Sequence, residues 1–134
     1  PLAALPEDAC ASCAELRAAM DSNEPVALLD VRDRNQFSMC RLDGAVNVPL
    51  RELLVDGPQK SKDRLQRELD LPASGGLTTQ QQQKKTLFVL CRRGVDSRVA
   101  TAFLRDAVDG VIVKNVDGGL LRWRADVDAT FPTY

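Results

Sequence analysis

The stretch that decides the fold is "TLFVLCRRGVDSRVATAFL", residues Thr86–Leu104. Its apolar first part has the length and composition of a buried strand, which we expect over Leu87–Leu90. The strand ends at Cys91, and from about Ser97 the apolar residues recur at helical spacing. The pattern therefore predicts a strand, a short loop from Cys91 to Asp96, and a helix.

The same alternation of short apolar runs and helical patterns continues along the chain and is typical of β-α units on a parallel sheet. The strands are expected at Ala9–Ala11, Val26–Val31, Ala45–Val48, Leu87–Leu90 and Val111–Val116. Helices are expected from a capping box at Ser12 and Glu15 to about Met20, over Asn35–Met39, in "PLRELL", in "SKDRLQRELDL" up to Pro72, and after Gly118–Gly119. The fold class is α/β.

Composition limits the possible functions. The 134 residues predict a single domain, 1–134, and the 44% apolar content suffices for a core. A formal net charge of -1 does not indicate binding to nucleic acid or to anionic membranes. We find no apolar window of about 18 residues and no targeting segment, and therefore expect neither span nor anchor. With no histidine, mechanisms and metal sites that depend on imidazole are excluded.

The four cysteines, at positions 10, 13, 40 and 91, show no disulfide framework, and we expect a reducing, cytoplasmic location. Cys10 and Cys13 form a C-x-x-C, which could bind zinc or act in redox chemistry. The capping box places Cys10 on a strand and Cys13 on a helix, which argues against both, so no metal or other cofactor is expected. Cys40 is either a core residue or a resolving thiol for Cys91.

One segment does not fit the alternation of strands and helices. Residues Ala73 to Lys85, "ASGGLTTQQQQKK", contain a glutamine run and little apolar content, and they predict a flexible surface loop within the domain.

Cys91 allows two interpretations. It could be an inert cysteine that closes a core strand, or a reactive thiol at the carboxyl end of a strand, where open α/β sheets bind ligands. The shortness of the loop favours the second interpretation. Gly94 can adopt the positive φ that a tight reversal needs, and the loop amides and the helix N-terminus would then converge above the sulfur. Such a site stabilises an anion, and Arg92, Arg93 and Arg98 add positive charge.

The length of the loop bears on which anion is held. A cysteine-dependent phosphatase needs an arginine after five intervening residues, and this chain has Ser97 there, with Arg98 one place further on. A persulfide, in which a second sulfur is bound to the cysteine, is smaller and singly charged. The sequence therefore favours sulfur chemistry over phosphate chemistry.

These residues resemble the rhodanese-like sulfurtransferases, whose six-residue active loop begins with the catalytic cysteine. "VALLDVRDRNQF", "CRLDGAVNVPL" and "NVDGGLLRW" are similar to further motifs of that family, in the same order. Cys40 and Arg41 stand where the family usually has glycine and histidine. The resemblance implies a five-stranded, mostly parallel sheet with helices on both faces.

The resemblance also implies roles for individual residues. Cys91 would be catalytic and residues Arg92, Arg93, Gly94, Val95, Asp96 and Ser97 would form the persulfide cradle. Asp30 and Arg32 would support the loop, although a strand-end ion pair explains them equally well. We expect Gly118 and Gly119 to form a tight turn and Trp123 to anchor the core.

A narrower resemblance rests on "CRRGVDS" and "DATFPTY", which are similar to the carboxy-terminal rhodanese domains of the adenylyltransferase and sulfurtransferase family of molybdopterin synthesis and tRNA thiolation. Val95 replaces an asparagine that is usual in that loop. The implied partners are a cysteine desulfurase-type sulfur donor, a ubiquitin-fold sulfur carrier, and an adenylating domain of the same full-length protein. A stand-alone thiosulfate or thiol sulfurtransferase and a catalytically silent docking domain remain as alternatives.

Overall fold

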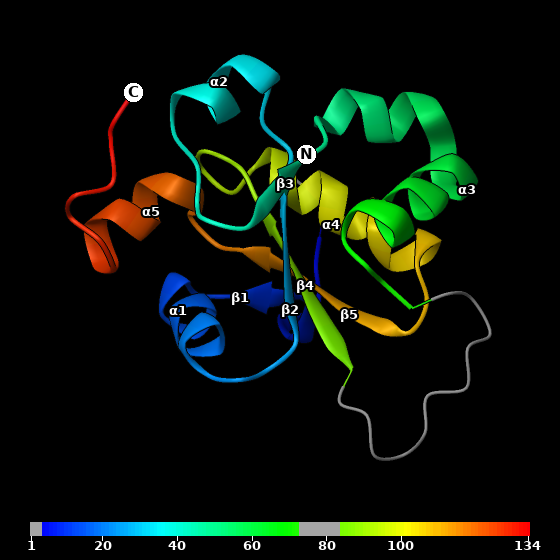
Figure 1. Cartoon of the computed structure of the whole chain (residues 1–134), viewed down its shortest axis with the longest axis horizontal. Helices are drawn as coiled ribbons and strands as arrows, with labels where there is room; N and C mark the ends of the chain where they lie inside the picture. Colours follow the sequence, from blue (N-terminus) through cyan, green and yellow to red (C-terminus); the bar gives the residue numbers. More distant parts are fainter. Residues whose placement is uncertain (1–3, 73–83) are drawn as a thin grey trace.

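The structure is a computed structural model that describes residues 4–72 and 84–134. Its centre is a five-stranded sheet in the order β1-β5-β4-β2-β3, and every pair of neighbouring strands is parallel (Figure 1). The strands are β1 (Cys10–Ala11), β2 (Val26–Asp30), β3 (Ala45–Asn47), β4 (Lys85–Leu90) and β5 (Val111–Val116). All five coincide with predicted strands, and the predicted α/β class is confirmed.

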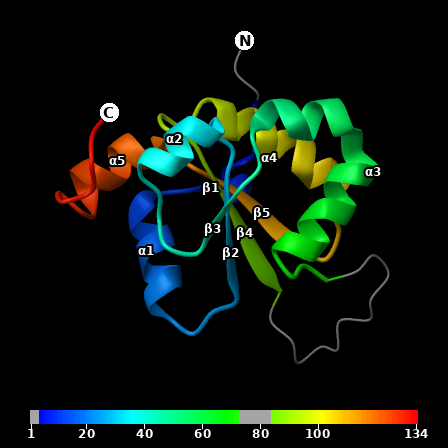
Figure 2. The same cartoon turned by 45° about the horizontal axis from the view of Figure 1, so that its top comes forward.

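Helices cover both faces of the sheet (Figure 2). One face carries α3 (Leu50–Glu68) and α4 (Asp96–Ala107), and the other carries α1 (Cys13–Asp21) and α5 (Gly119–Asp126). A short helix, α2 (Arg34–Met39), follows β2, and a turn of 3-10 helix at Glu7–Ala9 precedes β1.

The central strands β2 and β4 are largely apolar because both of their faces are buried. In β4, Leu87 and Val89 pack under α3 and α4, whereas Phe88 and Leu90 pack toward α1 and α5. This alternation follows from the two-residue period of a strand. The sheet thus divides the core into two apolar layers.

The paired register brings the chemistry-bearing residues to one edge of the sheet. Leu90 of β4 pairs with Asp30 of β2, so Cys91 and Val31 leave the sheet side by side. From here the chain continues in opposite directions, since β4 leads to β5 on one side and β2 leads to β3 on the other. Ligands of open α/β sheets bind at such a switch point, outside the carboxyl ends of the strands.

The main difference in bounds is in α3. Two helices were expected here, and α3 does consist of two helical stretches, but they are separated only by the non-helical backbone of Gly57, where φ is 82°. Pro58 follows directly and can begin a new helical stretch without needing an amide partner. The second stretch ends at Glu68, before the predicted stop at Pro72.

Smaller differences concern the ends of elements. Ala9 lies in the 3-10 turn rather than in β1, and α4 begins at Asp96, one residue before the predicted start. Lys85, which was assigned to the glutamine-rich loop, is the first residue of β4, while residues 73–83 of that loop lie outside the described residues. The capping box at Ser12 and Glu15 is present as expected.

No helix in the described part of the chain has the length and apolar character that crossing a bilayer requires.

Candidate active site

The loop after β4 wraps around the sulfur of Cys91. The main-chain N–H groups of Gly94 and Ser97 donate hydrogen bonds to Sγ over 3.0 Å and 3.4 Å. Gly94 has a φ of 84°, a conformation that residues with a β-carbon rarely adopt. The Cys91 side chain is nearly buried, whereas Arg93, Val95 and Asp96 are exposed and Arg92 is half-buried. The loop therefore turns its amides inward and most of its side chains outward.

The turn between β5 and α5 fixes the outside of this loop. The amides of Leu120 and Leu121 donate to the carbonyl oxygens of Cys91 and Arg92 over 2.9 Å and 3.0 Å. A β-carbon on Gly119 would lie 2.4 Å from the Cys91 carbonyl oxygen. Gly119 therefore does more than form the expected tight turn, because its missing side chain allows the loop to approach the α5 N-terminus.

Asp30 and Arg32 form a buried ion pair beside the loop. Arg32 Nε and Nη2 donate to the two carboxylate oxygens of Asp30 over 2.9 Å and 2.6 Å. Arg32 Nη2 also donates to the carbonyl oxygen of Cys40 over 2.6 Å. Burial by itself would lower the pKa of Arg32, but the hydrogen bonds with Asp30 and Tyr134 outweigh it, and the pKa is raised. The guanidinium is thus a fixed positive charge at the end of β2.

Tyr134 links this ion pair to the active loop. Two guanidinium groups contact its ring, with Arg32 at 5.5 Å and Arg92 at 4.8 Å from the ring centroid. Arg32 Nη1 donates to the phenolic oxygen over 2.7 Å, and Arg92 Nη2 donates to the Tyr134 carbonyl oxygen. Arg92 therefore holds the loop against this tyrosine through its side chain. Its Nε is buried and has no hydrogen-bond partner among the described residues.

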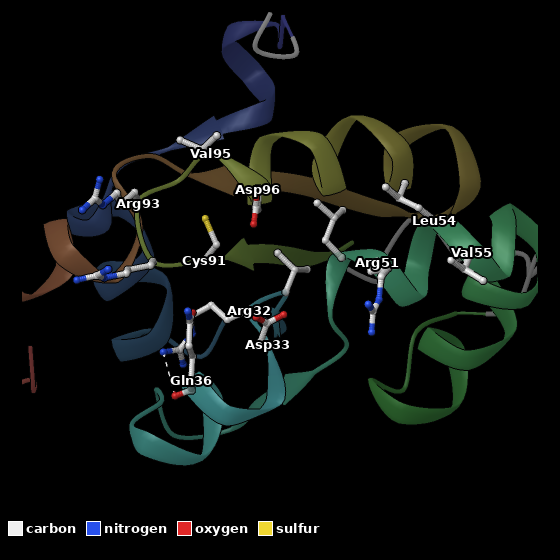
Figure 3. A pocket seen from close by; sticks show the side chains of 13 residues that line it. Arg32, Asp33, Gln36, Arg51, Leu54, Val55, Cys91, Arg93, Val95 and Asp96 are labelled. Carbon is white, nitrogen blue, oxygen red and sulfur yellow. Dashed lines mark hydrogen bonds between the residues drawn. The ribbon is translucent and has the colours of Figure 1, made fainter. Parts of the chain in front are cut away.

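A cleft of about 660 Å³ opens beside Cys91 (Figure 3). One side is lined by Cys91, by loop residues Arg92, Arg93, Val95 and Asp96, and by Val31, Arg32, Asp33 and Gln36 after β2. The opposite wall comes from α3, where Leu54 is 47% exposed and Val55 78% exposed. Figure 3 shows these two side chains on the far side of the cleft from Arg93 and Val95. The site therefore combines charged groups with an uncovered apolar wall.

An ion-pair network joins the two helices next to this cleft. Glu52 of α3 accepts hydrogen bonds from Arg34 of α2 over 2.8 Å and from Arg64 over 3.0 Å. These two hydrogen bonds lower the pKa of Glu52 to about 2. The network connects α2 to α3.

The other cysteines occupy different surroundings, and all four are free thiols. Cys13 is buried at the start of α1, and its thiol donates to the carbonyl oxygen of Gly119 over 3.6 Å. Cys40 is half-buried, and its sulfur lies 3.9 Å from Arg32 Nη1. The described residues contain no group of three or more cysteines and carboxylates arranged to hold a metal ion.

The sequence analysis missed two residues of this arrangement, Asn115 and Tyr134, and it missed the closeness of Gly119 to the loop. Ser97 donates its hydroxyl hydrogen to the side-chain oxygen of Asn115, which comes from β5 and is fully buried. An asparagine within a mostly apolar strand was the available signal for this contact. For Tyr134, and for the closeness of Gly119 to the loop, the sequence offers no local signal, because both contacts join segments that are distant along the chain.

Fold and site together define an α/β domain whose strand-end cysteine is enclosed by a tight loop of main-chain amides. The model of the rhodanese-like domain family matches residues 12–126, and the chain belongs to that family. The resemblance found in the sequence is thereby confirmed.

Curated relatives carry the same domain within longer proteins. The adenylyltransferase and sulfurtransferase MOCS3 of Sus scrofa is 34% identical over 117 residues, which are 86% of this chain and 25% of that protein. MOCS3-1 of Zea mays is 35% identical over 130 residues, 97% of this chain and again 25% of the relative. The chain therefore spans about a quarter of the length of these relatives.

Solved structures agree in fold. The human single-domain sulfurtransferase TSTD1 superposes with a TM-score of 0.63 at 24% identity, covering 88% of this chain and 96% of that one. A thiosulfate sulfurtransferase from Pseudomonas aeruginosa gives a TM-score of 0.64 at 19% identity, over 87% of this chain and 19% of that one. Family membership and the named activities of the relatives support an enzyme of the sulfurtransferase class.

Proposed function

We propose that this domain carries sulfur as a persulfide on Cys91 and passes it to the carboxy-terminal glycine of a ubiquitin-fold sulfur carrier, in molybdopterin synthesis and tRNA thiolation. The observation that carries the proposal is the pair of amides, of Gly94 and Ser97, that donate to the Cys91 sulfur at the floor of an open cleft. Donors fixed in this way stabilise negative charge on sulfur without rearrangement.

In the loading step, the Cys91 thiolate attacks the outer sulfur of a donor, and the donor's remaining group leaves with the electron pair of the broken bond. With thiosulfate the products are the persulfide and sulfite. With a cysteine desulfurase-type enzyme the donor is that enzyme's own persulfide, which is left as a thiolate. The cradle of Arg92, Arg93, Gly94, Val95, Asp96 and Ser97 surrounds the added sulfur, while Asp30 and Arg32 support it from β2.

In the transfer step, the terminal sulfur attacks the carbonyl carbon of the adenylated carrier, and AMP leaves. The resulting acyl disulfide is cleaved by a second thiol, which binds to Cys91 as a disulfide and releases the thiocarboxylate. A further thiol then regenerates Cys91. An adenylating domain of the same full-length protein would supply the activated carrier, and the four free thiols suit a reducing cytoplasm.

The uncovered apolar wall favours a protein acceptor over a small one. Leu54 and Val55 project from α3 into a cleft far larger than a thiosulfate ion needs. An extended protein tail with apolar side chains would cover them and bring its terminal carbonyl to the Cys91 sulfur. Thiosulfate is a small dianion and has no apolar group that would cover this surface.

The test uses the chain loaded with labelled sulfur from a desulfurase-type enzyme and then mixed with an adenylated ubiquitin-fold carrier. We expect the label to leave Cys91 and appear on the carrier as a thiocarboxylate, and Cys91→Ala to prevent both steps. Loading without transfer would instead indicate a stand-alone sulfurtransferase. If no donor loads the chain, the docking-domain alternative is correct.

A matched pair of variants tests the apolar wall. Leu54→Ser should reduce transfer to the carrier about tenfold, as loss of one apolar contact at an interface does, and leave thiosulfate loading unchanged because no charge is added to the cleft. The control is Ile112→Ser, which changes an apolar side chain of similar exposure, 40% against 47%, on a strand away from the cleft. Equal effects of the two variants on transfer would contradict the role of this wall.

A further inference from the structure

A line of polar groups runs from Cys91 through the core to the surface. The Cys91 thiol donates to the Ser97 hydroxyl oxygen over 3.2 Å, and the Ser97 hydroxyl donates to Asn115 Oδ1. Asn115 Nδ2 then donates to Asp117 Oδ1 over 2.8 Å. Ser97 and Asn115 are 0% exposed, whereas the Asp117 side chain is 52% exposed. The line thus connects the reacting thiol to a surface carboxylate.

The surface carboxylate fixes the direction of every hydrogen bond in this line. A carboxylate can only accept, so the amide nitrogen of Asn115 faces Asp117 and its oxygen faces Ser97. The Ser97 hydroxyl has a single hydrogen, which is given to that oxygen. Ser97 consequently presents a lone pair to the Cys91 sulfur. This arrangement matches a thiol, which has a hydrogen to donate, and does not match a thiolate.

Two influences therefore oppose each other at the sulfur. The amides of Gly94 and Ser97 favour negative charge, whereas the Ser97 hydroxyl oxygen favours the neutral thiol. If Cys91 ionises, its proton leaves to water in the cleft. The Ser97 hydroxyl can then donate to the thiolate only by turning its hydrogen away from Asn115 and toward the sulfur. The oxygen of Asn115, fully buried, then loses its donor, which is unfavourable.

We propose that Asn115 and Asp117 are positioning residues that hold the Ser97 hydroxyl turned away from Cys91 and thereby restrain the reactivity of the empty thiol. The restraint acts through hydrogen-bond direction, because an amide group between Ser97 and Asp117 does not pass protons along the line. It concerns the free thiol, so it goes beyond the proposed sulfur transfer and does not depend on which donor or acceptor the protein uses.

Charged groups from several elements surround Cys91. Those lining the cleft are Arg32, Asp33, Arg51, Arg92, Arg93 and Asp96. Behind the loop, Arg98 forms an ion pair with Asp117 over 3.8 Å. All except Asp117 stay the same in the variants below, so that any change in reactivity comes from the polar line or from the charge of Asp117 itself.

The experiment measures the rate at which iodoacetamide alkylates Cys91 between pH 6 and 9, read on the Cys91 peptide by mass spectrometry. Asp117→Ala frees the Asn115 amide to turn and the Ser97 hydroxyl to donate to the sulfur. We expect the rate at neutral pH to rise about fivefold, the equivalent of one hydrogen bond redirected to the thiolate. The substituted side chain is largely exposed, so the variant should fold.

Loss of the Asp117 charge could by itself raise the alkylation rate of Cys91. The Ser97→Ala variant separates this charge effect from the effect of the polar line. This substitution removes the hydroxyl but keeps the main-chain N–H that donates to Cys91. In the Ser97→Ala background, Asp117→Ala should have no effect, because the line is already broken. An equal rise in both backgrounds would show a direct charge effect and overturn the proposal, and so would an unchanged or slower rate in Asp117→Ala alone.

Discussion

Cys91 and Cys13 are buried to a similar depth, 4% and 2% exposed, and both lie against the turn between β5 and α5. The main chain meets the two sulfurs in opposite ways. Amides of Gly94 and Ser97 donate to Cys91, whereas the Cys13 thiol donates to the carbonyl oxygens of Asp117 and Gly119 over 3.8 Å and 3.6 Å.

The comparison shows that depth alone does not decide what a cysteine can do. Burial raises the pKa of Cys13 to about 11, and the negative charge of Asp126 adds to that effect. Cys13 is therefore a neutral thiol at physiological pH and packs as a small apolar residue. At Cys91 the surrounding amides point their hydrogens at the sulfur, and the side chain lines an open cleft.

The strongest test of this contrast changes the turn that the two sites share. In Gly119→Ala the new β-carbon would lie 2.4 Å from the Cys91 carbonyl oxygen and 2.6 Å from that of Arg92. The loop must shift, and a misplacement of about 1 Å costs roughly 100-fold in rate. We expect the rate of persulfide formation from thiosulfate to fall by that factor. The rate is measured by the release of sulfite.

Gly57→Ala is the matched control for this substitution. Gly57 also has a positive φ, 82°, but a β-carbon there would meet no atom within 4 Å. The control should lose about 1 kcal/mol of stability through backbone strain and keep its rate of persulfide formation. Equal losses of rate in the two variants would mean that strain, and not the contact with the loop, explains the effect.

A second test, of intermediate size, concerns the stability contributed by the Cys13 thiol. Its pKa is raised from 9.0 to about 11, so in alkaline solution the unfolded chain ionises this thiol before the folded protein does. The free energy of unfolding should be unaffected below pH 9 and should fall as the pH rises from 9 to 11. Urea unfolding at several pH values measures this slope. Cys13→Ala should reduce it, and an unchanged slope would contradict the assigned environment.

The smallest expected effect is at the mouth of the cleft beside Cys91. Asp96 is exposed there, and we expect its negative charge to repel small dianions. Asp96→Arg should raise the thiosulfate:cyanide sulfurtransferase rate about two- to fivefold. The control is Asp63→Arg, which makes the same charge change at an exposed site on α3 outside this cleft. An unchanged or lower rate in Asp96→Arg would remove this role.

Much of the fold could be predicted because its signals are local. Each strand contains a short apolar run, and the capping box at Ser12 marked the start of α1. The position of Cys91 and the positive φ of Gly94 followed from the tightness of the loop. In α3 local reasoning was incomplete, because Gly57 and Pro58 were not recognised as a kink between two helical stretches of one element.

The remaining features depend on contacts between distant segments. The partner of Ser97 is Asn115 on β5, and the residue that contacts both Arg32 and Arg92 is Tyr134. Neither contact can be deduced from spacing, since both require knowing that β5 lies next to β4 and that the 128–134 segment reaches the end of β2. The sequence therefore located the reactive sulfur, and the structure was needed to find what holds its surroundings.

The most direct test of the central contrast is to map where sulfur is added. The folded chain would be incubated with thiosulfate and alkylated, and each cysteine peptide would then be examined by mass spectrometry for one added sulfur, about 32 Da. We predict one added sulfur on the Cys91 peptide and no added sulfur on Cys13. Added sulfur on Cys13, with Cys91 left as a free thiol, would contradict this account.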